Sequence, residues 1–115
     1  MQYALLIYNP DDGTEQGQRP IDPDIAAVLA RPDVTGWIRL HAAGSATTVH
    51  HQDGRTLLTD GPFVDSKEFL GGLVVVEADN LDGALAVAAE VQQLRPGRVV
   101  AIEVRPIRDA KISDA

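Results

Sequence analysis

The stretch that most constrains the fold is Asp60-Gly61-Pro62, which can continue neither a strand nor a helix. Proline fixes its own φ and lacks a backbone N–H, and glycine adopts conformations that other residues avoid. Apolar, strand-like segments lie on both sides, at 56–59 and 72–78. The tripeptide therefore predicts a loop between strands, and such loops often carry binding or catalytic groups.

The segment 22–43 has the pattern of a broken helix. Asp22-Pro23 is a helix start, with the aspartate as N-cap and the proline in the first turn. Pro32 interrupts it, because a proline inside a helix breaks or kinks it. Asp33 is expected to cap a second helical piece, which carries Val34, Trp37, Ile38 and His41 on one face and stops at Gly44. The alternative is one short helix followed by a loop.

A second helix is expected to start at residues 79–82, where an acidic first turn suits the helix dipole. Its end is expected at 95–97, an Arg-Pro-Gly sequence. Apolar residues at helical spacing predict the face that packs on the core. These residues are Leu81, Leu85, Ala88 and Val91, with Ala84 beside them.

The remaining segments are expected to be strands and loops. Residues 2–8 predict the first strand and 99–105 the last. Residues 46–51 and 56–59 predict a hairpin, because Asp53-Gly54 is among the strongest short hairpin signals. Residues 14–19 are expected to form a mobile polar loop, and residues 109–115 a frayed tail.

This order of elements predicts one α+β domain over residues 1–115. We expect a ferredoxin-like split βαβ fold with an antiparallel sheet and an inserted hairpin. Strands 2–8 and 72–78 are apolar at both odd and even positions, so both sheet faces should be covered. Two helices can cover one face, and a second copy related by two-fold symmetry would cover the other. The sequence therefore predicts a homodimer.

Composition excludes several classes of function. The chain has no cysteine, so it can have neither disulfides nor a thiolate site. Its net charge of −7 argues against binding to nucleic acid or to an anionic membrane. The N-terminus lacks the pattern of a signal peptide, and no apolar run approaches a membrane span. We expect a soluble, cytoplasmic protein.

Asp60 and His41 are the candidate catalytic residues. A carboxylate beside a strand end can act as a general base, and an imidazole can transfer protons near neutral pH. The structural alternatives are an Asx interaction of Asp60 with the turn amides, and a histidine packed against the core. Lys67 and Glu68 follow Asp60 by seven and eight residues. Either would reach Asp60 only if the loop curls back.

The other polar candidates carry weaker signals. His50 and His51 are neighbours on a predicted strand, so they point to opposite faces and cannot chelate one metal together. Arg39, Arg55 and Arg105 could bind an anion, although surface ion pairs are the usual fate of such arginines. The sequence has no P-loop, no dinucleotide-binding fingerprint and no metal-ligand spacing. We predict no cofactor and no metal.

A family resemblance rests on the same loop. Asp60-Gly61-Pro62-Phe63, followed by Ser-Lys-Glu-Phe-Leu-Gly-Gly at 66–72, resembles the signature of the DGPF proteins, the larger branch of the YCII-related family. The segments 3–8, 46–49 and 99–106 agree with it. The resemblance implies a small bacterial, dimeric α–β barrel of mostly uncharacterised function. It makes Pro62, Phe63, Lys67 and Glu68 candidate substrate-binding residues.

Three functions remain open at this point. The first is a dimeric enzyme with a small-molecule pocket at the Asp-Gly-Pro-Phe loop. An acidic residue and a histidine in a cleft have suggested such a role for the wider family. The second is a regulatory or binding module, since some members resemble partners of extracytoplasmic-function sigma factors. The third is a small-molecule binder without turnover.

Overall fold

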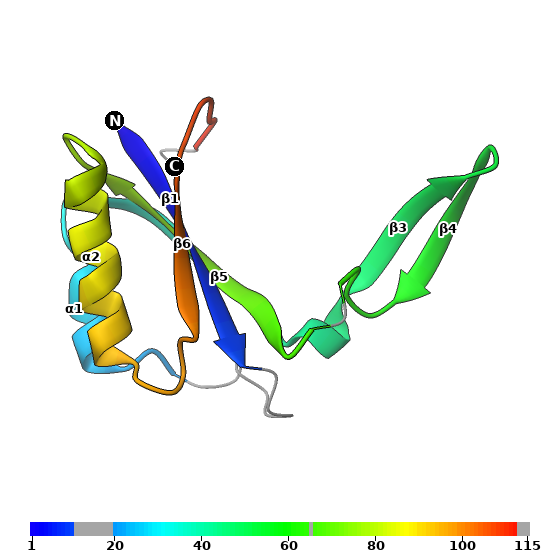
Figure 1. The fold of residues 1–115 in the computed structure, drawn as a ribbon, viewed down its shortest axis with the longest axis horizontal. Helices are drawn as coiled ribbons and strands as arrows, with labels where there is room; N and C mark the ends of the chain where they lie inside the picture. Colours follow the sequence, from blue (N-terminus) through cyan, green and yellow to red (C-terminus); the bar gives the residue numbers. More distant parts are fainter. Residues whose placement is uncertain (11–19, 65, 113–115) are drawn as a thin grey trace.

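The computed structural model of the chain describes residues 1–10, 20–64 and 66–112. These residues form a four-stranded sheet, two α-helices and a separate two-stranded hairpin (Figure 1). The elements are β1 (Gln2–Pro10), α1 (Pro23–Leu29), β2 (Val34–Arg39), the 3-10 turn η2 (Ala43–Ser45), β3 (Thr47–Gln52), β4 (Arg55–Asp60), β5 (Glu68–Glu77), α2 (Leu81–Leu94) and β6 (Ala101–Pro106).

The main sheet has the strand order β2-β5-β1-β6, and each neighbouring pair is antiparallel. The two central strands are the ones that the sequence marks as apolar at both odd and even positions. Central strands of this kind need cover on both faces. The mixed α+β architecture, with an antiparallel sheet and two helices among the described residues, is compatible with a ferredoxin-like fold.

The helical interpretation of residues 34–43 is wrong, because residues 34–39 form strand β2 at the edge of the sheet. Val34, Thr35, Trp37 and Ile38 are β-branched or aromatic, and such residues fit a pleated surface well. Pairing with β5 satisfies their backbone groups. The order of elements predicted from the sequence therefore had a helical segment in place of strand β2.

The predicted break at Pro32 is confirmed. Helix α1 ends at Leu29, so residues 22–43 do not form one straight helix. Asp22 is the N-cap and Pro23 the first helical residue, as the sequence predicts. The Asp22 side chain, however, makes no capping hydrogen bond to the helix and pairs with arginines instead.

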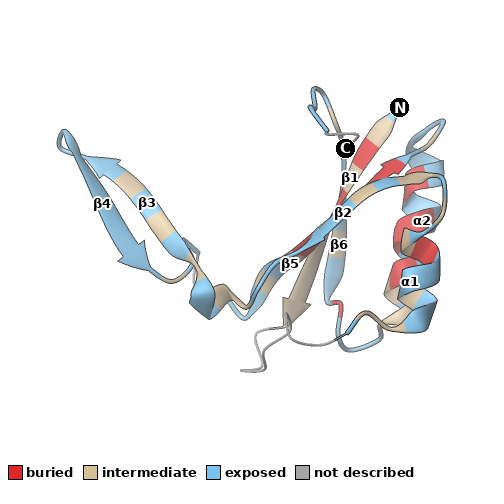
Figure 2. Cartoon of the chain, turned by 180° about the vertical axis from the view of Figure 1, so that it is seen from behind, coloured by how far each residue is buried: buried red, intermediate tan, exposed pale blue. Residues whose placement is uncertain are grey.

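The core lies between the helices and one face of the sheet (Figure 2). From the sheet it contains Tyr3, Leu5, Val74 and Val76, and Val28 joins them from α1. The face of α2 that packs on them differs from the predicted stripe, because Leu81 and Leu85 are exposed. Small side chains line the packed face instead and allow the helix to approach the sheet. These are Ala84, Val87, Ala88 and Val91.

The opposite face of the sheet carries no helix among the described residues. Ile38 lies on this face, where the strand register sets it beside Leu73, which in turn pairs with Leu6. The Ile38 side chain is 53% exposed, and Leu70 is also exposed. We call this apolar surface the bare sheet face.

The hairpin of β3 and β4 projects away from the sheet (Figure 1). Asp53 and Gly54 both have positive φ, of 53° and 74°, as the predicted two-residue hairpin turn requires. The radius of gyration of 15.7 Å exceeds the value of about 13 Å expected for a compact chain of this length. Val49 and Leu58, which face each other across the hairpin, are 65% and 71% exposed.

Strand β5 begins at Glu68, four residues before the predicted start at Gly72, so Phe69 to Gly71 also lie in the sheet. Its pairing with β1 shifts between Ile7 and Tyr8, which leaves Gly71 as an extra residue on β5. A side chain at Gly71 would collide with that of Asn9. The predicted loop at 14–19 and the last three residues of the predicted tail lie outside the described residues.

Candidate functional site

A hollow lies at the junction between the main sheet and the hairpin. Its walls come from the end of β2, the chain around η2, the Asp-Gly-Pro-Phe loop and the start of β5. Four of the candidate site residues line it, namely His41, Pro62, Phe63 and Glu68. We call this site the loop hollow. Most of its surface is apolar, and Tyr8, Phe69 and Leu70 contribute to it.

The backbone around Gly61 fixes the direction in which the loop leaves the hairpin. Gly61 has a φ of 98°, a conformation that favours glycine. Its N–H donates to the Ala46 carbonyl at 2.7 Å, and its own carbonyl accepts from the Thr48 hydroxyl at 2.8 Å. These two bonds tie the loop to the start of β3, and Pro62 and Phe63 then turn into the hollow.

Asp60 is the last residue of β4 and lies opposite Thr47. Its side chain is exposed, and it is not among the described residues that line the loop hollow. Among the described residues, the carboxylate has no hydrogen bond or ion pair, and the N–H of Gly61 is bound by Ala46 instead. The predicted Asx interaction is therefore not seen there, and the carboxylate is open to a ligand.

His41 follows β2 by two residues and lines the loop hollow. It does not end a helix, as the sequence had predicted, because the preceding segment is a strand. The Leu40 N–H donates to the Gly71 carbonyl at 2.9 Å, which extends the β2–β5 pairing up to the histidine. The imidazole is exposed at the end of a hydrogen-bonded strand. Asp60 and His41 are thus not brought into contact by any bond found among the described residues.

Glu68 is the first residue of β5 and lines the hollow, whereas Lys67 is exposed and is not among the described lining residues. The Ser66 hydroxyl donates to Glu68 Oε2 at 3.2 Å and accepts from the Glu68 N–H at the same distance. Ser66 thus holds both the backbone and the carboxylate of Glu68. Asp65, which precedes Ser66 in the sequence, lies outside the described residues.

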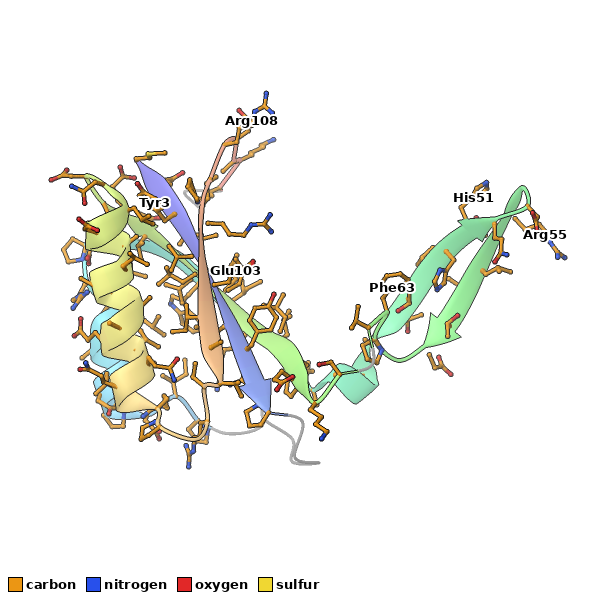
Figure 3. All side chains as sticks on the ribbon, viewed as in Figure 1. Tyr3, His51, Arg55, Phe63, Glu103 and Arg108 are labelled. Carbon is orange, nitrogen blue, oxygen red and sulfur yellow. The ribbon has the colours of Figure 1, made fainter. Side chains whose placement is uncertain are left out.

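The two neighbouring histidines have different surroundings, as the alternation of a strand requires. His50 is half-buried, and its ring packs against Phe63 with 5.5 Å between the ring centroids. His51 is exposed and lies toward the tip of the hairpin, near Arg55 (Figure 3). His50 therefore supports a residue of the loop hollow. The sequence left open which of the two histidines would do so.

The three arginines proposed as an anion site are spread over the molecule. Arg55 lies at the hairpin tip (Figure 3). Arg105 on β6 pairs with Glu103 at 3.8 Å. Arg39, at the end of β2, lines a different cavity, which lies between the helices and the sheet. The three therefore do not form one site.

That second cavity was not predicted from the sequence. Arg95 and Arg98, which border it, are far from its sheet residues along the chain. They follow α2 and belong to no binding motif in the sequence. No local sequence pattern could therefore predict that they border a cavity. We call this space the interlayer cavity, and it shares Leu40 with the loop hollow.

The loop hollow combines an imidazole and a carboxylate with apolar and aromatic walls. Such a combination can bind an organic molecule and move a proton at a polar group of it. In the part of the chain that the structure describes, no group of three or more His, Cys, Asp or Glu side chains could hold a metal ion. No helix among the described residues is long and apolar enough to cross a membrane.

Comparisons with known proteins agree with the resemblance at the level of the YCII-related family. A family model described as the YCII-related domain matches residues 1–108. An uncharacterised protein of Rhizobium meliloti (strain 1021) is 32% identical, in an alignment that covers 93% of this chain and 92% of the relative. The match includes the sheet, both helices, the hairpin and the loop hollow. The chain belongs to the YCII-related family.

Proposed function

We propose that this protein is a dimeric small-molecule-binding protein of the DGPF branch, with acid–base activity at the loop hollow. The observation that carries the proposal is the meeting of His41, Phe63 and Glu68 in one hollow. His41 follows β2, whereas Phe63 and Glu68 lie in the segment that leads from β4 into β5. The branch assignment is supported by the sequence Asp60-Gly61-Pro62-Phe63.

Each candidate residue has a role in this proposal. Pro62 and Phe63 supply an apolar wall, and the Phe63 ring packs against His50. His41 and Asp60 are the proposed acid–base pair, and both act on the ligand rather than on each other. The Asp60 carboxylate suits this role because it is exposed and has no partner among the described residues. Glu68 and Lys67 are proposed to bind polar groups of the ligand.

The proposed dimer buries the bare sheet face against a second copy, as in an α–β barrel built on the split βαβ fold. The support is the exposed apolar surface around Ile38 and Leu70. Large exposed apolar patches on soluble proteins mark interaction surfaces. The hairpin adds to this support, because an isolated two-stranded hairpin is marginally stable in water. Cover from a second copy would stabilise Val49 and Leu58, which are exposed on it.

A ligand screen that monitors the NMR signals of the histidine side chains tests the proposed pocket. The chain has three histidines, whose imidazole protons are expected to give separate NMR signals, and His41→Gln identifies that of His41. A panel of small carbonyl and carboxylic-acid compounds is added, and the expected result is a shift of the His41 signal by at least one compound. For that compound, Phe63→Ala and Asp60→Asn should each weaken binding by about tenfold, the size of one lost contact of 1–2 kcal/mol.

The matched control is Leu81→Ala, which truncates an exposed apolar side chain on α2, away from the hollow. It should leave binding unchanged. Asp60→Asn should change the free energy of unfolding by less than about 0.5 kcal/mol, the usual range for a surface substitution. If the Asp60→Asn variant bound the compound as tightly as the unchanged protein, Asp60 would not belong to the site. A panel that shifts no His41 signal would contradict the pocket itself.

A further inference from the structure

The interlayer cavity lies between α1, the end of α2 and the helix-side face of the sheet. It has a volume of about 160 Å³. Its inner walls are apolar and include Ile25, Val28, Val74, Val91 and Trp37. A pocket of this volume with apolar inner walls has room for an apolar group about the size of benzene. Trp37 is the single tryptophan of the chain, so it can report on anything that enters.

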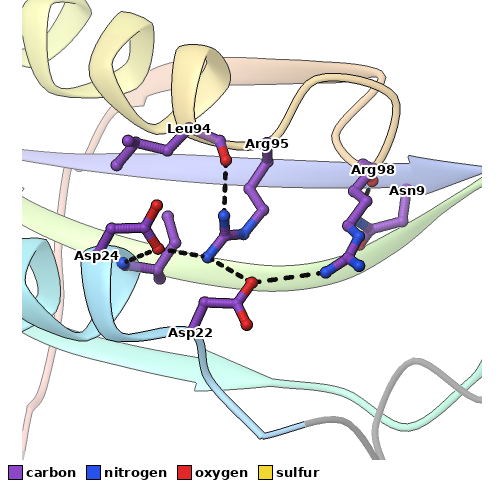
Figure 4. A network of polar contacts seen from close by, with 7 residues as sticks. Asn9, Asp22, Asp24, Leu94, Arg95 and Arg98 are labelled. Carbon is purple, nitrogen blue, oxygen red and sulfur yellow. Dashed lines mark hydrogen bonds and ion pairs between the residues drawn. The ribbon is translucent and has the colours of Figure 1, made fainter.

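The mouth of the cavity is polar. Arg39, Arg95 and Arg98 line it together with Asp22. Arg95 bridges Asp22 and Asp24, with 2.9 Å to each carboxylate (Figure 4). The hydrogen bond from Arg95 lowers the pKa of Asp24, so this carboxyl stays charged at neutral pH. Two guanidinium groups, those of Arg95 and Arg98, thus meet the carboxylates of Asp22 and Asp24 at the mouth.

Arg98 is the arginine of the mouth that is best placed to meet a ligand. Its side chain is 53% exposed, and its contact with Asp22 is long, at 3.5 Å. Arg95, by contrast, is only 16% exposed and already holds two carboxylates. Arg95 thus shapes the mouth, and Arg98 supplies the available positive charge.

The backbone that carries Arg98 is fixed to the sheet. The Asn9 side-chain amide donates to the Arg98 carbonyl at 2.7 Å (Figure 4). Gln92 donates to the next carbonyl, that of Val99, at 2.7 Å, and the Val100 N–H donates to Tyr8 at 2.8 Å. The Asn9 side chain fits here because Gly71 has no side chain to occupy the same space. The backbone beneath Arg98 therefore needs little reordering when the side chain binds an anion.

We propose that the interlayer cavity binds a small amphipathic carboxylate. Its apolar body would fill the space beside Trp37, and its carboxylate would lie at the mouth against Arg98. A guanidinium fits a carboxylate because its N–H groups can donate two parallel hydrogen bonds. This site is separate from the loop hollow, so it does not depend on the function proposed there.

Titration of Trp37 fluorescence with hexanoate, hexanol and hexylammonium tests the proposal. The three probes share one apolar chain, differ in charge and do not absorb where tryptophan does. Hexanoate should change the emission saturably, hexanol more weakly, and hexylammonium least. Arg98→Gln should weaken hexanoate binding by about tenfold through loss of a charged hydrogen bond, and should leave hexanol unchanged. Arg98→Lys should restore part of the affinity, because it keeps the charge without the planar fork.

The matched control is Arg108→Gln, which removes the same charge from a side chain that is 97% exposed and pairs with Asp109. It should bind hexanoate as the unchanged protein does. A thermal melt of each variant checks that the fold is intact. Equal binding of the three probes would overturn the carboxylate assignment. Absence of a saturable change with every probe would overturn the site.

Discussion

Leu5→Ala is expected to lower the free energy of unfolding by about 2–5 kcal/mol, the range measured for large-to-small changes in protein cores. Leu5 lies on the central strand β1 and is fully buried. It pairs with Val74 on β5 and with Val104 on β6, beneath the helices. Truncation would remove apolar contacts and leave a cavity that strands paired on both sides cannot close. Urea denaturation followed by circular dichroism measures the effect.

The control for this change is Leu85→Ala, which removes the same atoms from a leucine of α2 that is 44% exposed. Alanine is the better helix former, and the site loses less buried area than the Leu5 site, so the loss should stay below about 1 kcal/mol. A similar loss of stability from both variants would mean that Leu5 is not in the core of the protein in solution.

Gly72→Ala is expected to cost about 1–3 kcal/mol, the usual range for overpacking. A Cβ atom at Gly72 would lie 2.9 Å from the Ile38 carbonyl oxygen. The obstacle is the backbone of β2, so relief requires this edge strand to move away from β5. Hydrogen exchange should therefore show faster exchange of the Leu40 N–H, which donates to the neighbouring Gly71. Urea denaturation measures the loss of stability.

Gly44→Ala is the matched glycine change. A Cβ at Gly44 meets no atom within 4 Å. The substitution should therefore leave stability within about 0.5 kcal/mol of the starting protein. If Gly72→Ala were equally harmless, the close approach of β2 and β5 at this point would be wrong.

The parts of the fold that were predicted correctly rest on local chemistry. Asp53-Gly54 specified the hairpin turn, and its two positive φ angles are the ones that such a turn requires. Pro32 ended α1, because no helix interior accommodates a proline without disruption. The start of α2 also followed local rules, since the Asn80 side chain accepts a hydrogen bond from the Gly83 N–H.

Strand β2 could not be predicted from its own residues. Val34, Trp37 and Ile38 have the spacing of a helix face, and the same residues have high strand propensity. The choice depends on β5, which supplies hydrogen bonds and a hydrophobic neighbour from more than thirty residues away along the chain. The face of α2 was misplaced for a similar reason. Two leucines lie on its exposed side, while alanines and valines meet the sheet.

The candidate site was predictable where residues share one loop. Pro62, Phe63 and Glu68 line the loop hollow, as their place in the Asp-Gly-Pro-Phe segment suggested. His41 joins them for a different reason, because β2 and not a helix leads to it. The interlayer cavity depends on where α2 ends over the sheet, which no local spacing encodes.

The pairing of two chains across the bare sheet face is tested most directly by sedimentation equilibrium of the intact protein. Ile38 and Leu70 leave apolar surface on that face, and Val49 and Leu58 leave more on the hairpin. We expect a particle with twice the chain mass of 12.3 kDa at micromolar concentration. A particle with the mass of one chain, stable and free of aggregation under the same conditions, would contradict the proposed dimer.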